Sequence, residues 1–134
     1  MRHIISILTT LLALTSCDWI NSDQKLLRET KNKKLIGFKT MYLSELGDDK
    51  YENLVKEYFK NKVEIKYIND IIYVSYLDEL NACGLYDGNL EIKGDTIKLI
   101  VDLISDEVCA STSIERITFL IDNPNGEKKI IKKQ

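Results

Sequence analysis

Residues 63–76 read VEIKYINDIIYVSY, and this stretch decides the fold class. Apolar and polar side chains alternate on both sides of Asn69-Asp70, which is the pattern of strands with one covered face. A two-residue turn at this point gives three cross-strand pairs, which are Val63 with Tyr76, Ile65 with Val74 and Tyr67 with Ile72. All six side chains then share one face. The stretch therefore predicts an antiparallel β-hairpin.

A second hairpin is predicted around the turn at Gly94-Asp95. Apolar residues alternate with polar ones on both sides of that turn. Its pairs are Leu90 with Leu99 and Ile92 with Ile97. Gly88 falls opposite Val101, which leaves room for a bulge or for close packing against the glycine.

Three further segments show strand patterns, at residues 36–42, 117–121 and 128–133. The cluster 123–126, Asn-Pro-Asn-Gly, is a strong turn signal before the last strand. One helix is predicted over residues 49–60, with Asp48 as its N-cap. Its apolar face consists of Tyr51, Leu54, Val55, Tyr58 and Phe59.

These elements amount to about seven strands and one amphipathic helix, so the expected fold is mainly β. Short connections favour antiparallel neighbours, because a parallel pair needs a long crossover. We expect an antiparallel sandwich or a curled sheet, with the helix over one end or face. An α+β arrangement, with the helix packed on a single antiparallel sheet, is the alternative.

The composition is that of one globular domain, with 134 residues, 44% hydrophobic and 30% charged. A formal net charge of -2 provides no basic field, so we expect no nucleic-acid partner. The only histidine is His3, in a leader that we expect to be removed. We therefore predict no histidine-based catalysis, no metal site and no cofactor.

Residues 1–16 look like a bacterial export signal. The cationic start Met1-Arg2-His3 is followed by an apolar run from Ile4 to Leu14. Eleven residues are too few for a transmembrane helix, which needs about 20.

The run ends in Leu14-Thr15-Ser16-Cys17, which resembles the lipobox of bacterial lipoproteins. The resemblance covers residues 1–17 only. It implies cleavage before Cys17, a diacylglyceryl group on the Cys17 thiol, and acyl chains such as palmitate on the new N-terminus. Residues 17–33 would then be a lipidated cysteine and polar tether, and residues 34–134 an antiparallel β domain. An ordinary secretory leader is the alternative.

This resemblance places the protein outside the cytoplasm, anchored by lipid to a bacterial cell membrane. The sequence leaves the inner and the outer membrane open. With Cys17 lipidated, Cys83 and Cys109 remain as an even pair in an exported chain, which predicts a disulfide between them. That bond would bring residues 81–88 next to residues 109–113.

The candidate binding surface consists of Ile68, Ile71 and Tyr73, which share the outer face of the first hairpin. Burial of these side chains under another element is the competing interpretation. No pattern indicates catalytic residues. We expect a cell-envelope lipoprotein that acts as a binding or structural module, with a protein partner in the envelope. The alternatives are an inhibitor or immunity-type protein that masks a partner, and a hydrolase that works without histidine.

Overall fold

The computed structural model describes residues 31–127 and 129–133. The predicted signal peptide, Cys17 and the tether up to residue 30 lie outside the described residues. A compact unit from Asn32 to Gln134 contains the strands and the helix.

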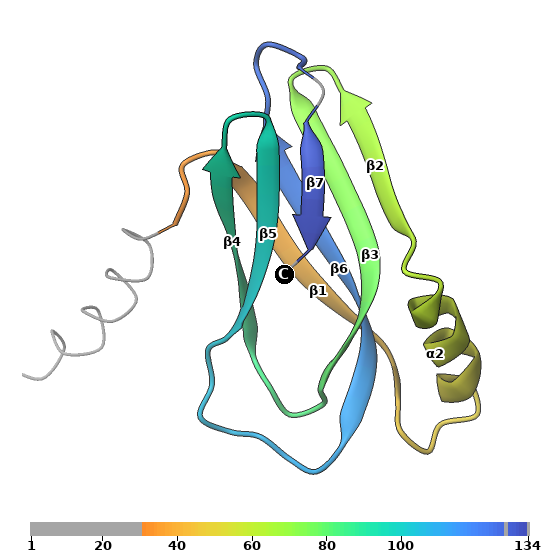
Figure 1. Ribbon diagram of the computed structural model, residues 1–134. Helices are drawn as coiled ribbons and strands as arrows, with labels where there is room; N and C mark the ends of the chain where they lie inside the picture. Colours follow the sequence, from red (N-terminus) through yellow and green to blue (C-terminus); the bar gives the residue numbers. More distant parts are fainter. Residues whose placement is uncertain (1–30, 128, 134) are drawn as a thin grey trace, which may run out of the picture. The chain divides into compact units, whose positions relative to one another are not determined.

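Seven strands form two sheets in this unit, and one helix, α2 (Tyr51–Phe59), accompanies them (Figure 1). The first sheet has the order β1-β6-β3-β2 and is antiparallel throughout. Its strands are β1 (Leu35–Glu45), β6 (Thr112–Asp122), β3 (Ile71–Asn81) and β2 (Val63–Ile68). The second sheet has the order β4-β5-β7. Its strands are β4 (Tyr86–Lys93), β5 (Thr96–Leu103) and β7 (Ile130–Lys133). The predicted fold class, mainly β with one helix, is confirmed.

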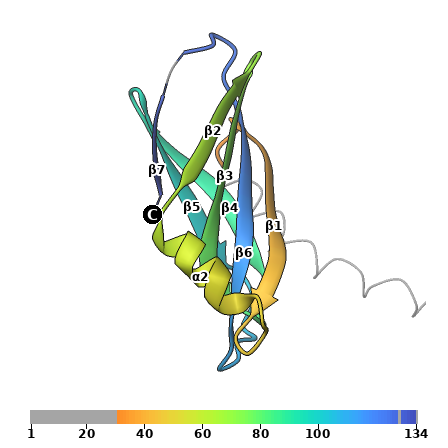
Figure 2. The same ribbon diagram turned by 90° about the vertical axis from the view of Figure 1, so that its right-hand side faces the viewer.

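The core lies between the two layers, which Figure 2 shows edge-on. Its centre is Phe119 on β6, which is fully buried. The Phe38 ring meets Phe119 edge-on at 5.0 Å between centroids, and the Tyr76 ring stacks on Phe119 at 6.5 Å. From the second sheet, Leu90, Ile97 and Leu99 pack into the same cluster. Burial of this apolar surface is the main force that holds the layers together.

Both predicted hairpins have the predicted register. Across β2 and β3, Val63 pairs with Tyr76, Ile65 with Val74, and Tyr67 with Ile72. Across β4 and β5, Leu90 pairs with Leu99, Ile92 with Ile97, and Gly88 with Val101. The two-residue turns need a positive φ, which Asn69 and Gly94 supply at 50° and 60°.

Gly88 on β4 lies directly against Phe38 on β1, between the two sheets. A Cβ atom at this position would lie 2.2 Å from Cδ2 of Phe38. Only a residue without a side chain fits there. Of the two possibilities predicted at Gly88, a bulge or close packing, the structure has the close packing, and its partner is the aromatic ring from β1.

The last strand departs from the expected arrangement of antiparallel neighbours. β7 crosses to the second sheet and pairs with β5 in parallel, Thr96 opposite Ile130. Asn123 stabilises the crossing, because its backbone N–H donates to the Asp70 carbonyl at 2.7 Å and its side-chain amide donates to the Glu127 carbonyl at 3.1 Å. A turn cluster marks a change of direction but does not select the partner strand.

β2 is more exposed than the alternating pattern predicts. Its residues Ile65 and Tyr67 share the inner face of the first sheet, yet both are exposed. The opposing sheet ends with the four-residue β7, which is too short to cover them. The Tyr67 hydroxyl bridges this gap, since it accepts the Lys129 N–H at 3.0 Å and donates to the Lys129 carbonyl at 3.2 Å.

The helix also differs from its prediction at both ends. Its N-cap is Lys50, with no side-chain capping bond, and Asp48 is not the cap. The Asp48 carboxylate instead accepts bonds from the end of β1, from the Glu45 N–H and from the hydroxyls of Tyr42 and Ser44. At the other end Phe59 is 74% exposed and does not belong to the packed face.

The helix packs on the outer face of the first sheet through Tyr51, which is buried. The Tyr51 hydroxyl donates to Glu79 at 2.6 Å and lies 2.8 Å from the Thr112 hydroxyl. Ile114, fully buried on the same face, completes this second apolar cluster. The helix therefore covers only the lower half of that face in the view of Figure 1.

Candidate functional site: the disulfide-linked loop end

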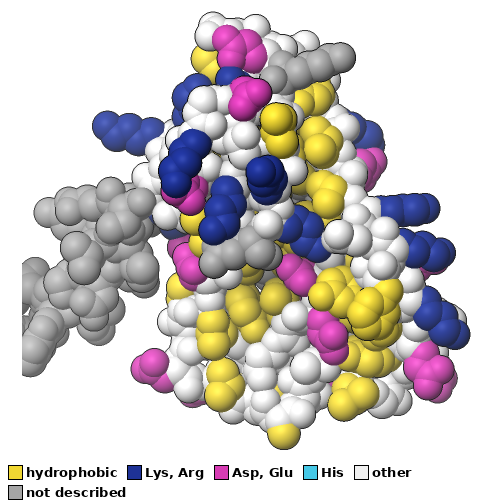
Figure 3. Space-filling view, in the orientation of Figure 1, with side chains coloured by type: hydrophobic (Ala, Val, Ile, Leu, Met, Phe, Trp, Pro, Cys, Tyr) yellow, Lys and Arg dark blue, Asp and Glu magenta, His cyan; other side chains and the backbone are white. Residues whose placement is uncertain are grey.

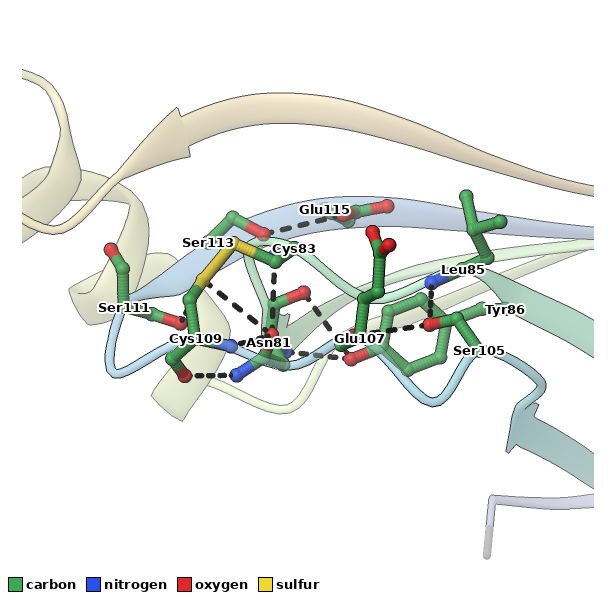
Figure 4. Close-up of a disulfide and its surroundings, with 10 residues drawn as sticks. All are labelled: Asn81, Cys83, Leu85, Tyr86, Ser105, Glu107, Cys109, Ser111, Ser113 and Glu115. Carbon is green, nitrogen blue, oxygen red and sulfur yellow. Dashed lines mark hydrogen bonds between the residues drawn. A yellow bond between two sulfur atoms is a disulfide. The ribbon is translucent and has the colours of Figure 1, made fainter.

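Cys83 and Cys109 form a disulfide, as predicted (Figure 4). Their Cα atoms lie 5.7 Å apart, and 26 positions separate the two residues in the chain. The bond joins the β3–β4 connection to the β5–β6 connection. These two loops lie at the lower end of the sandwich in Figure 1.

Asn81, the last residue of β3, organises the two loops. Its side-chain amide donates to the Cys109 carbonyl at 2.6 Å, and its side-chain oxygen accepts the backbone N–H groups of Cys83 and Cys109, each at 3.1 Å. The Tyr86 hydroxyl accepts the Asn81 backbone N–H at 2.7 Å. One asparagine thus satisfies backbone groups of both loops, which a disulfide alone does not do.

The β5–β6 connection is also bound to the start of β4. The Ile104 N–H donates to the Leu85 carbonyl at 2.8 Å, and the Leu85 N–H donates to the Ser105 hydroxyl at 2.9 Å. Ser105 in turn donates to the Glu107 carbonyl at 3.2 Å. These bonds join the two loops along their length.

This well-ordered end presents apolar side chains to solvent. The loop-end surface, as we call it, consists of Leu85, Leu103, Ile104 and Val108, which are 65%, 45%, 48% and 61% exposed. Figure 4 shows the Leu85 side chain turned away from the hydrogen-bonded cluster around Asn81. Leu85 and Ile104 lie on one face of the β4–β5 pair, and Leu103 lies on the other. Scattered exposed leucines are ordinary, but four exposed apolar residues at one hydrogen-bonded loop end are typical of an interaction site.

The charge around the loop-end surface has one sign. Residues 77–92 and 99–115 contain four acidic residues each and no Lys, Arg or His. The net charge of the whole chain is only -2, so the remainder of the chain is positive on balance. Asp102, Asp106 and Glu107 are exposed beside the apolar residues. In Figure 3 hydrophobic side chains gather at this lower end, and the Lys and Arg side chains lie above it and to its right.

The binding surface predicted from the sequence, Ile68, Ile71 and Tyr73, lies on the β2–β3 hairpin and not at the loop end. Ile68 pairs with Ile71 across the first hairpin, and Tyr73 pairs with Lys66 on the same outer face. Ile68 is exposed, whereas Ile71 and Tyr73 are half-buried. The Lys66 ammonium lies 5.8 Å from the centroid of the Tyr73 ring. This patch is smaller than the loop-end surface and carries a cation.

Two acids face each other inside the lower end of the sandwich. Asp78 on β3 is the register partner of Glu115 on β6, on the inner face. Burial raises the pKa of Asp78, and the nearby Lys133 ammonium opposes that shift. Glu115 is buried and accepts the Ser113 hydroxyl at 3.2 Å. Among the described residues no three His, Cys, Asp or Glu side chains are grouped closely enough to hold a metal ion.

Sequence reasoning located this end of the molecule only through its cysteines. It placed Asn81 and Gly84 within the loop stretch 81–88 without giving either a role, and it missed Ser105. A Cβ atom at Gly84 would lie 2.7 Å from Cδ1 of Leu103. Asn81 had a recognisable signal, because asparagine two residues before a loop N–H often accepts a bond from it. The exposure of Leu103, the last residue of β5, had no signal, since its strand pattern is the same as that of its buried neighbours.

No helix in the described part of the chain has the length and apolar character to cross a membrane. Comparison with known proteins gave no match to a family model, to a curated protein or to a solved structure.

Proposed function

We propose that this protein is a cell-envelope lipoprotein whose β domain binds a protein partner through the loop-end surface. Lipid on Cys17 would hold the chain at a bacterial membrane, and the disulfide-linked loops would be the docking face. The observation that carries the docking proposal is the exposure of Leu85, Leu103, Ile104 and Val108 within an exclusively acidic region.

The anchor is supported by the lipobox-like stretch Leu14-Thr15-Ser16-Cys17. The disulfide agrees with it, because such bonds persist in oxidising compartments outside the cytoplasm. Two or three acyl chains bind far more firmly than one, since each buried methylene contributes about 0.8 kcal/mol.

The chemistry of the loop-end surface determines the kind of partner. Apolar side chains at the centre of an interface lose water on binding, and charged residues at the rim select and steer the partner. An acidic rim selects a protein surface with an apolar centre and Lys or Arg at its edge. Anionic lipid headgroups are repelled by the same rim, so a bilayer surface is not the ligand of this face.

The anchor is tested by labelled-fatty-acid incorporation in cells. The unchanged chain should take up label, and Cys17→Ala should take up none, because the acylated thiol is gone. The matched control is Cys83→Ala with Cys109→Ala, which should leave labelling intact. Continued labelling of Cys17→Ala would remove the anchor from the proposal.

The docking face is tested by a photo-crosslinking residue placed at Leu85 or Val108 in the native envelope. We expect one discrete adduct, joined to a peptide of the partner that is rich in Lys and Arg. The double change Asp106→Lys and Glu107→Lys should abolish this adduct, because it reverses the rim charge. The same residue at Ile36, exposed on β1, is the control and should give none.

An adduct obtained only from Ile68 would instead place the docking face on the patch of Ile68, Ile71 and Tyr73. Equal adducts from Leu85, Ile68 and Ile36 would contradict both surfaces.

A further inference from the structure

A groove lies on the outer face of the first sheet, between the C-terminal end of α2 and strands β2, β3 and β6. Its volume is about 400 Å³. The side chains that matter for its chemistry are Glu57, Lys62, Glu64, Ser75, Leu77 and Arg116. It is separate from the loop-end surface.

The first observation is an unsatisfied serine that lines this groove. Ser75 is 2% exposed, and its hydroxyl has no hydrogen-bond partner among the described residues. A buried hydroxyl without a partner costs free energy, so native proteins normally supply a protein group, a water or a ligand. The Ser75 hydroxyl lies in the middle of a strand and has no partner in the described part of the chain. This indicates that a group entering the groove forms the missing hydrogen bond with it.

The second observation is the state of the four charges. Glu57 is already paired with Lys60, and Glu64 with Lys66 at 2.7 Å, and neither of those lysines lines the groove. The two cations in the groove, Lys62 and Arg116, act on these carboxylates only through space: Lys62 helps to lower the pKa of Glu57, and Arg116 that of Glu64. The ion pairs of the two carboxylates are with Lys60 and Lys66 instead. The groove therefore contains carboxylates whose ion-pair partners lie outside it, and cations whose N–H donors are left for an entering group.

Arg116 and Ser75 are placed to act on one group. Arg116 pairs with Leu77 in the β3–β6 ladder, and Ser75 is two residues before Leu77 on the same face. Diagonal neighbours of this kind are within reach of a long side chain. A guanidinium presents a planar pair of N–H donors that matches a carboxylate, and a serine hydroxyl adds a third donor.

We infer that this groove binds a carboxylate, with Arg116 as its ion-pair partner and Ser75 as a further donor. Half-buried Leu77 provides an apolar wall, so the ligand is a carboxylate on a short, partly apolar body. The C-terminus of a peptide and a free small acid share this chemistry. The inference is independent of the proposed partner at the loop end.

The test uses the full chain in detergent and follows backbone and Arg116 side-chain NMR signals. The probes are N-acetylalanine, the longer N-acetyltrialanine with a free carboxylate, and N-acetylalanine amide, which has no carboxylate. We expect both acids to shift the signals of Ser75, Leu77 and Arg116, and the amide to leave them in place. Tighter binding of the longer probe would identify a peptide terminus as the source, and equal binding a free small acid.

Three variants complete the test. Arg116→Gln should weaken binding of the acid by about 10- to 100-fold, because it removes a charged hydrogen-bonding pair. Ser75→Ala should weaken it less. Lys132→Gln removes an exposed cation of β7 that does not line the groove, and this variant should bind as the unchanged chain does. Thermal melting of each variant establishes that it is folded.

Equal binding of the amide, unaltered affinity in Arg116→Gln, or no shift with either acid would overturn the inference. In the last case a bound water would be the partner of Ser75.

Discussion

The ammonium nitrogen of Lys133 lies 4.4 Å from the centroid of the Tyr76 ring and 5.8 Å from that of Tyr58. It also donates to the side-chain oxygen of Asn61 at 3.3 Å. Lys133 is the last residue of β7, Tyr76 belongs to β3, and Tyr58 belongs to α2. One lysine thus links the short last strand to the helix and to the opposite sheet, where strand pairing provides no contact.

Lys133→Gln is expected to lower the free energy of unfolding by about 1 to 2 kcal/mol, the value of a partly desolvated cation–π contact. The control is Lys132→Gln, because Lys132 is exposed on the same strand and has the same charge. Urea denaturation of the two variants gives the comparison. Equal midpoints would show that the contact with Tyr76 contributes nothing.

Asp78→Asn is expected to stabilise the protein at neutral pH. Burial raises the pKa of Asp78 above the ordinary value of 3.8, so the folded state favours the protonated acid and its ionisation costs stability. Protonated Asp78 contributes to the stability of the unchanged chain at low pH. That contribution is lost as the pH rises from 3.8 through the raised pKa of Asp78. The advantage of Asp78→Asn should therefore be present at about pH 7 and absent below about pH 3. Urea midpoints at both pH values test it, and a less stable variant at pH 7 would reverse the sign.

Removal of the disulfide by Cys83→Ala with Cys109→Ala should cost roughly 3 to 4 kcal/mol, because the unfolded chain regains the freedom of a closed loop. A reducing agent should shift the melting temperature of the unchanged chain in the same direction and leave the double variant unaffected. The Asn81 bonds to both loops remain in the variant, so the fold should persist. An unaltered melting temperature would mean that these bonds suffice.

Gly88→Ala is expected to destabilise by about 1 to 3 kcal/mol, since the new methyl group would overlap the Phe38 ring. Gly37→Ala is the matched control, because a Cβ atom there lies 3.6 Å from the nearest atom, in Leu120, which is ordinary contact. Calorimetric melting separates the two variants. Similar effects of both would show that the β1 side of the sandwich shifts to accommodate the methyl group.

The candidate site was predictable only in part. The even cysteine pair predicted which loops meet, and the structure places Cys83 beside Cys109. The surface predicted from alternation, around Ile68, is present but partly buried. The apolar residues of the loop-end surface were not predicted: Leu103, Ile104 and Val108 lie outside the two stretches, 81–88 and 109–113, that the expected disulfide brings together, and no local pattern indicates their exposure.

The sequence by itself determined the two hairpins and their registers, because a period of two residues and a two-residue turn act over neighbouring positions. Only the tertiary structure decided that β7 joins β5 rather than β6, and that Ile65 and Tyr67 remain exposed. Strand order and coverage depend on packing between the two sheets. That packing involves residues far apart in the chain, and alternation is the same in a covered strand as in an uncovered one.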